Sequence, residues 1–235
     1  MENHGCHQHA CAGGSLLQAL HAELVCHWPY AIFATALSLA ILSFVTNSAT
    51  EVCAGAPNRV GLLALFHSFH FMHIMFASTG TVVTYLRFCR SVVRTLVVGA
   101  LAPMFFCVLS DAILPYVGGR LLGVDMYFHI CFFHELKNVL PFLAAGILNG
   151  FVMKMHYGSD RLGWLSLMAH TGHIFVSALA SMFYLVAHGF SDWANHIGAV
   201  FVLLVICVVL PCTMSDVVVP MILARTGKKN EKYPA

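Results

Sequence analysis

Six long apolar segments dominate the 235-residue chain and restrict what it can fold into. They cover roughly residues 24–46, 60–86, 92–117, 127–153, 163–187 and 197–224. At 1.5 Å per residue, a helix of this length crosses a hydrocarbon core of ~30 Å. Hydrophobic residues make up 59% of the chain and charged residues only 9%, whereas charged residues are about a quarter of a soluble domain. The sequence therefore predicts an all-α polytopic membrane protein with six transmembrane helices.

Three short phrases occur twice in the same order. The first phrase is Glu-Leu followed by a proline, at Glu23-Leu24 with Pro29 and again at Glu135-Leu136 with Pro141. The second is a histidine pair, His70-x-x-His73 and again His170-x-x-His173. The third is Cys-x-x-Ser-Asp followed by a proline, at Cys107-x-x-Ser110-Asp111 with Pro115 and again at Cys212-x-x-Ser215-Asp216 with Pro220. Chance similarity between apolar helices explains one such match, but not three in one order. We interpret residues 21–120 as a first three-helix repeat and residues 121–225 as a second.

An odd number of spans in each repeat makes the second copy enter the membrane from the opposite face. The predicted fold is therefore a pair of inverted-topology repeats, which is common in transporters and places the substrate site between the repeats. Basic residues are concentrated on the side that holds both termini: Arg87, Arg90, Arg94, Lys154, Arg161, Arg225, Lys228, Lys229 and Lys232, against Arg59 and Arg120 on the other side. This bias predicts cytoplasmic termini, in a bacterial inner membrane or an equivalent one. The basic tail, residues 226–235, is typical of a membrane anchor rather than a nucleic-acid site.

Ionisable side chains inside these apolar segments are the candidate functional groups, because they are costly in a membrane and usually functional. The predicted ligands are His70, His73, His170, His173, Asp111 and Asp216, followed in rank by His67, His129, His134 and Glu135. At 100° per residue, the three histidines of the second segment lie on one side of its helix. Imidazole with carboxylate suits Zn²⁺, Ni²⁺, Co²⁺, Fe²⁺ or Mn²⁺, whereas Cu⁺ favours sulfur and Mg²⁺ or Ca²⁺ favours oxygen. The cysteines and serines of the repeated phrases are expected to pack as small residues.

These features favour a transporter that moves a divalent transition-metal ion, with Zn²⁺ as the first candidate, over an enzyme. The ligands bind metal only when deprotonated, so the ion can be exchanged for protons. Pro115 and Pro220 are the expected hinges. The expected partners are the lipid bilayer, the metal ion and protons, with self-association left open and no nucleic acid.

Two other functions use the same histidines. One is a membrane-embedded metalloenzyme, a hydrolase or an oxidase, and the other is a small-solute channel with a histidine-lined pore. Haem fits less well, because three histidines follow one another on a single helix. The zinc-protease motif fails, because Asn138 stands where His134-Glu135 would require a second histidine.

The first 20 residues are rich in metal-binding side chains: His4, Cys6, His7, His9 and Cys11. This composition is typical of a flexible metal-binding tract. A disordered tail or a purification remnant would have the same composition.

Overall fold

The computed structural model describes residues 16–52, 59–89, 91–130, 135–156 and 159–224. Within these ranges the chain is helical apart from short connections. The helices are α1 (Leu16–Val52), α2 (Arg59–Phe88), α3 (Val92–Val108), α4 (Leu114–Leu121), α6 (Leu136–His156), α7 (Ser159–Ala187) and α8 (Ile197–Thr213). The π-helical segments η2 (Leu109–Ile113) and η4 (Met214–Val218) continue α3 and α8, and a 3₁₀ turn, η3 (Trp193–His196), precedes α8.

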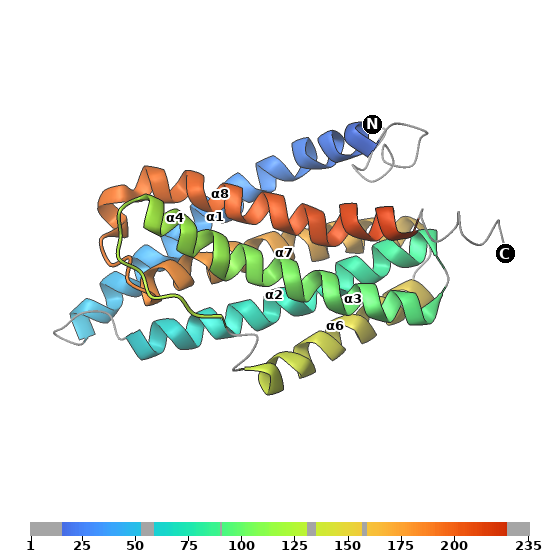
Figure 1. Ribbon diagram of the computed structural model, residues 1–235, viewed down its shortest axis with the longest axis horizontal. Helices are drawn as coiled ribbons and strands as arrows, with labels where there is room; N and C mark the ends of the chain where they lie inside the picture. The colour runs from blue at the N-terminus through green and yellow to red at the C-terminus, as the bar shows by residue number, and fades with distance from the viewer. Residues whose placement is uncertain (1–15, 53–58, 90, 131–134, 157–158, 225–235) are drawn as a thin grey trace.

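The described part of the chain forms six helical spans that are long and apolar enough to cross a membrane. This confirms the predicted all-helical fold and the predicted number of spans. The spans run side by side along the long axis of the molecule (Figure 1). The beginning of α1, the α2–α3 turn, the end of α6 and the end of the last helix lie at one end of the bundle (Figure 1).

The predicted start of the fourth span at residue 127 is wrong, because α6 begins at Leu136. The residues before it, 124–130, are not helical, and their backbone bonds to the end of α7 instead. The Tyr127 N–H donates to the His188 carbonyl at 2.9 Å, and the His129 N–H donates to the Tyr184 hydroxyl at 3.1 Å. These partners satisfy backbone groups that a helical turn would otherwise satisfy.

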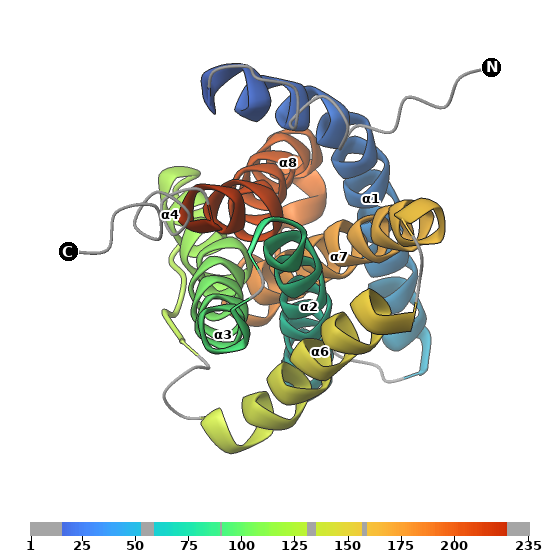
Figure 2. The same ribbon diagram turned by 90° about the vertical axis from the view of Figure 1, so that its right-hand side faces the viewer.

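Helices α2 and α7 occupy the middle of the bundle, surrounded by the other spans (Figure 2). Helix α1 packs on α7 and α8, whereas α6 packs mainly on α2. The first helix of each predicted repeat therefore packs on the middle helix of the other repeat.

Small residues allow α6 to approach α2 closely. A Cβ atom at Gly146 would lie 2.3 Å from the Met75 carbonyl oxygen, and one at Gly150 would lie 2.7 Å from Val82 Cβ. The Thr79 hydroxyl donates to the Gly146 carbonyl at 3.0 Å. The Gly146-x₃-Gly150 spacing thus permits a close helix–helix contact.

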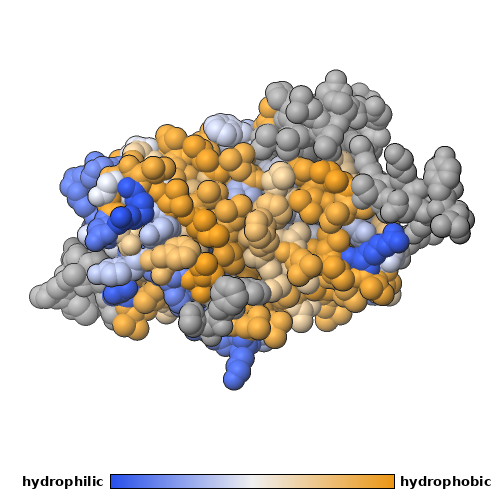
Figure 3. Space-filling model, viewed as in Figure 1, coloured by the Kyte–Doolittle hydropathy of each residue, from blue (hydrophilic) through white to orange (hydrophobic). Residues whose placement is uncertain are grey.

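The distribution of polarity suits lipid rather than water. Large apolar side chains such as Phe33, Phe44 and Leu148 are exposed on the outside, while histidine and aspartate side chains are buried inside. Apolar residues cover most of the middle of the face shown in Figure 3, and hydrophilic residues gather mainly towards its ends. The molecule has the character of a multi-pass membrane protein with a polar centre.

Candidate metal centre

Both Cys-x-x-Ser-Asp phrases fold into the same local structure. A proline lacks the N–H that the carbonyl four residues earlier would accept, and these carbonyls belong to Asp111 and Asp216 because the prolines are Pro115 and Pro220. The helix widens in both places: the Leu114 N–H donates to Leu109, and the Val219 N–H donates to Met214. Such π-helical turns are frequent at functional sites. Each turn places its aspartate inside the bundle.

In the first half, Asp111 joins the two histidines of α2. Its Oδ2 atom accepts hydrogen bonds from His70 Nδ1 at 2.8 Å and from His73 Nδ1 at 2.7 Å. The other carboxylate oxygen, Oδ1, accepts bonds from the Ser110 hydroxyl at 2.7 Å and the Ser177 hydroxyl at 3.1 Å. The four bonds explain how a fully buried carboxylate is accommodated.

The second half repeats this arrangement with Asp216 and the histidines of α7. Asp216 Oδ2 contacts His173 Nδ1 at 2.5 Å and His170 Nδ1 at 3.2 Å. Its Oδ1 atom has no hydrogen-bond partner among the residues that the structure describes. Ala77 stands in α2 where α7 has Ser177, counted from the repeated histidines. The two carboxylates are therefore unequal, and Asp216 retains an oxygen that can accept a further bond.

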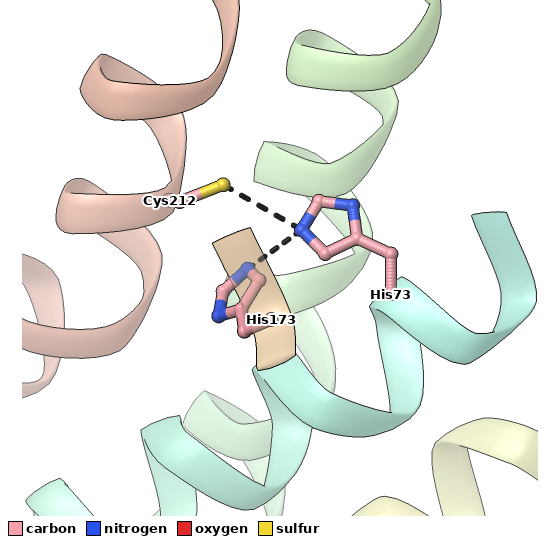
Figure 4. A group of neighbouring side chains, drawn as sticks. All are labelled: His73, His173 and Cys212. Atoms are coloured by element: carbon pink, nitrogen blue, oxygen red, sulfur yellow. Dashed lines mark hydrogen bonds between the residues drawn. The ribbon is translucent and has the colours of Figure 1, made fainter. Parts of the chain in front are cut away.

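The two halves meet at a pair of imidazole nitrogens. His73 Nε2 lies 2.6 Å from His173 Nε2, and Cys212 Sγ lies 3.6 Å from His73 Nε2 (Figure 4). A carboxylate oxygen only accepts hydrogen bonds, so Nδ1 of each histidine carries the proton. Nε2 of each neutral ring then presents a lone pair to the other ring. Such a pair is favourable only with a proton or a cation between the rings.

A reciprocal pair of hydrogen bonds joins the middle helices to the π-helical turns. The Thr81 hydroxyl on α2 donates to the Ser215 carbonyl, and the Ser181 hydroxyl on α7 donates to the Ser110 carbonyl, each at 3.0 Å. Each middle helix thus holds the aspartate-bearing turn of the other half in place.

These contacts create three overlapping groups of metal-binding side chains. They are His73 with His173 and Cys212, His70 with His73 and Asp111, and His170 with His173 and Asp216, and the ligand atoms in each group lie within 4.8 Å of one another. All seven residues are at most 6% exposed. The buried histidine, aspartate and cysteine groups can therefore hold a metal ion.

Three of the four second-rank residues of the sequence prediction, His67, His129 and Glu135, belong to none of these three groups. His67 and His129 lie near one another, with ring centroids 6.0 Å apart, and Glu135 pairs with the Asn138 amide just before α6. His134 and the histidine- and cysteine-rich residues 4–11 lie outside the described residues.

Sequence reasoning missed two residues of the centre. The expectation that Cys212 serves as a packing residue is incomplete, because its thiol lies beside the histidine pair. Ser177 was missed because no second copy of it exists at position 77. The repeat of Cys107 as Cys212 indicated that this cysteine has a role. Its apolar neighbours in the sequence nevertheless favoured the prediction that it packs as a small residue.

Comparison with known protein families, curated proteins and solved structures finds no match to this chain.

Proposed function

We propose that this protein moves a divalent transition-metal ion across a membrane, and that the ion binds between His73 Nε2 and His173 Nε2. The observation that carries the proposal is the 2.6 Å separation of these two atoms, whose rings are both fixed through Nδ1 by a buried aspartate. A histidine held by a carboxylate through its other nitrogen is the usual arrangement of a metal ligand in proteins. In this proposal Asp111 and Asp216 orient the ligands, and His70 and His170 hold the carboxylates.

The ligand chemistry favours Zn²⁺ among the candidate ions. Two imidazoles and a thiol suit Zn²⁺ and Co²⁺, whereas Mn²⁺ prefers oxygen ligands. Metal–nitrogen bonds of ~2.0–2.1 Å require two ligand nitrogens about 3.3 Å apart in a tetrahedral site. Binding would therefore move the two rings apart by about 0.7 Å, a shift that a small movement of α2 against α7 can supply.

The buried position of the centre favours alternating access. An ion reaches residues that are at most 6% exposed only if the surrounding helices move. We propose that the two halves are inverted repeats that rock against each other, with the π-helical turns before Pro115 and Pro220 as hinges. The reciprocal Thr81 and Ser181 contacts and the exchanged positions of α1 and α6 support this symmetry.

Proton exchange follows from the same pair of nitrogens. The space between them can hold a proton or a metal ion, but not both, so ion release would accompany proton uptake. The basic residues at one end of the bundle favour an orientation with both termini in the cytoplasm.

The proposal is tested by Zn²⁺ flux into proteoliposomes containing the full chain. We expect the wild-type protein to admit Zn²⁺ and the His73→Ala/His173→Ala variant to lose at least about nine-tenths of that flux, because two ligands disappear. His156→Ala, which removes an exposed histidine at the end of α6, is the matched control and should retain it.

Metal content separates the alternatives. Stoichiometric metal in the purified protein without any flux would refute transport and favour a metalloenzyme. A purified protein that binds no metal and conducts a neutral solute, with a flux that does not depend on His73 or His173, would favour a channel.

A further inference from the structure

A second group of histidines lies at the end of the bundle where α7 ends. His67 comes from α2, His129 from the non-helical segment 124–130, and His188 follows α7 directly. The ring centroids of His67 and His129 are 6.0 Å apart, and those of His129 and His188 are 5.8 Å apart. With metal–nitrogen bonds of ~2.0–2.1 Å, two imidazoles on one ion have centroids about 5 to 6 Å apart. The ring spacing lies within this range, but the ligand nitrogens are less closely gathered than those of the three central groups. A shared ion therefore requires the rings to turn towards it.

The hydrogen bonds of His188 leave one ring nitrogen available as a ligand. Its Nδ1 contacts the Tyr184 carbonyl oxygen at 2.9 Å, and a carbonyl only accepts, so Nδ1 carries the proton. In the neutral ring, the other nitrogen, Nε2, then presents a lone pair. The Tyr184 ring stacks on His188 with centroids 4.0 Å apart, which fixes the direction of that lone pair.

His67 also has a nitrogen available for binding. Its Nε2 atom is buried and has no hydrogen-bond partner within the part of the chain that the structure describes. The Glu135 carboxylate lies within electrostatic range of this ring. A buried imidazole nitrogen beside an acidic group favours a cation as its partner.

Phe66 separates this group from the central histidines. Its fully buried ring stacks on His70 at 5.6 Å between centroids and meets the edge of His188 at 5.8 Å. His67 and His73 are six residues apart on α2, which corresponds to about 9 Å along the helix. The Phe66 ring therefore contacts one histidine of each group, and the groups come closest along α2, where His67 lies three residues from His70.

We propose that His67, His129 and His188, with Glu135 as a nearby counter-charge, form a second binding site for a divalent transition-metal ion at the end of the bundle where α7 ends (the mouth site). His67 and His129 are half-buried and His188 is buried, so the site borders both the surroundings and the interior. This site would bind the ion before it enters the central site or after it leaves it. That role rests on the proposed transport function, whereas the ability of the site to bind metal does not. Phe66 would then be the barrier that an ion passes between the two sites.

The test counts Co²⁺ and Zn²⁺ equivalents by calorimetry and absorption spectroscopy on the purified full chain. The central variant is His73→Ala/His173→Ala/Cys212→Ser, and the mouth variant is His129→Gln/His188→Gln, in which glutamine can still donate to the Tyr184 carbonyl. Differences between variants cancel any metal held by residues 1–15. We expect each variant to bind about one equivalent fewer than wild type, and the combined variant about two fewer.

The matched control is His196→Gln, which alters an exposed histidine at the same end of the bundle and should leave the count unchanged. A mouth variant that binds as many equivalents as wild type overturns the proposal. If its elution profile or Tm indicates misfolding, the single variant His129→Gln decides, because the two hydrogen bonds between His129 and the Tyr184 hydroxyl use the His129 backbone. Failure of Zn²⁺ flux with both equivalents intact would refute transport and leave the mouth site standing.

Discussion

At the scale of single residues, the two aspartates determine what the histidines can bind. Because Asp111 and Asp216 accept from Nδ1, the Nε2 atoms of His73 and His173 are turned towards each other and towards the thiol of Cys212. The aspartates occupy equivalent places but differ in their partners. Asp111 accepts two serine hydroxyl bonds that have no counterpart at Asp216 among the described residues.

Replacing Cys212 by serine tests whether its thiol is a ligand. We expect Cys212→Ser to lower Cd²⁺ affinity by about tenfold or more and Zn²⁺ affinity by less, because Cd²⁺ depends more on sulfur. Competition titrations with the two ions measure the ratio. Cys107→Ser is the matched control, since Cys107 occupies the equivalent place in the first phrase and belongs to none of the three ligand groups. Equal effects of the two substitutions would contradict a ligand role for Cys212.

At the scale of the helices, the prolines and small residues position the ligands. The π-helical turns before Pro115 and Pro220 bring each aspartate onto the histidines of its own half. The glycines of α6 bring its backbone against α2, whose histidines face the centre. The position of α2 therefore depends on a close helix contact in addition to its own sequence.

Enlarging Gly146 should separate α6 from α2. In Gly146→Leu the new side chain meets the Met75 carbonyl and Ser78, and overpacking of this kind costs about 1 to 3 kcal/mol. We expect Tm to fall by roughly 3 to 10 °C in a thermal melt of the purified protein. Gly61→Leu is the control, because a Cβ atom there meets nothing within 4 Å. Similar Tm values for the two variants would mean that the α6–α2 contact contributes little.

At the scale of the whole molecule, the two halves are interlocked rather than merely adjacent. Helix α1 packs on α7, α6 packs on α2, and the hydroxyls of Thr81 and Ser181 cross to the opposite turns. These contacts join the two halves of the chain directly. Under the proposed transport function, such contacts would couple the movement of one half to that of the other.

An imposed pH gradient tests the coupling to protons. If a proton replaces the ion between His73 and His173, protons that move down their gradient drive metal in the opposite direction. We expect Zn²⁺ to accumulate in proteoliposomes with an acidic lumen and to be depleted when the lumen is alkaline, as measured with a zinc-sensitive dye. Zn²⁺ uptake that does not depend on the pH gradient would indicate uniport of the metal instead.

The sequence predicted the number of spans and the four histidines and two aspartates of the repeated phrases that meet at the centre, because apolar length and repeated phrases are local signals. It misplaced the start of the fourth span, since residues 127–130 are apolar enough for a helix but bond to Tyr184 and His188 instead. It also assigned Cys212 to packing, because sulfur in an apolar segment has the same pattern whether or not it faces a ligand.

By itself, the sequence determined that the chain is a set of apolar helices carrying paired histidines and aspartates. The tertiary structure alone decided which nitrogens face one another, which carboxylate has the spare oxygen, and that the His188 ring lies beside that of His129. These outcomes depend on the crossing of helices far apart in the chain and on hydrogen bonds that select a ring nitrogen. Neither the helix crossings nor these hydrogen bonds can be predicted from a pattern of neighbouring residues in the sequence.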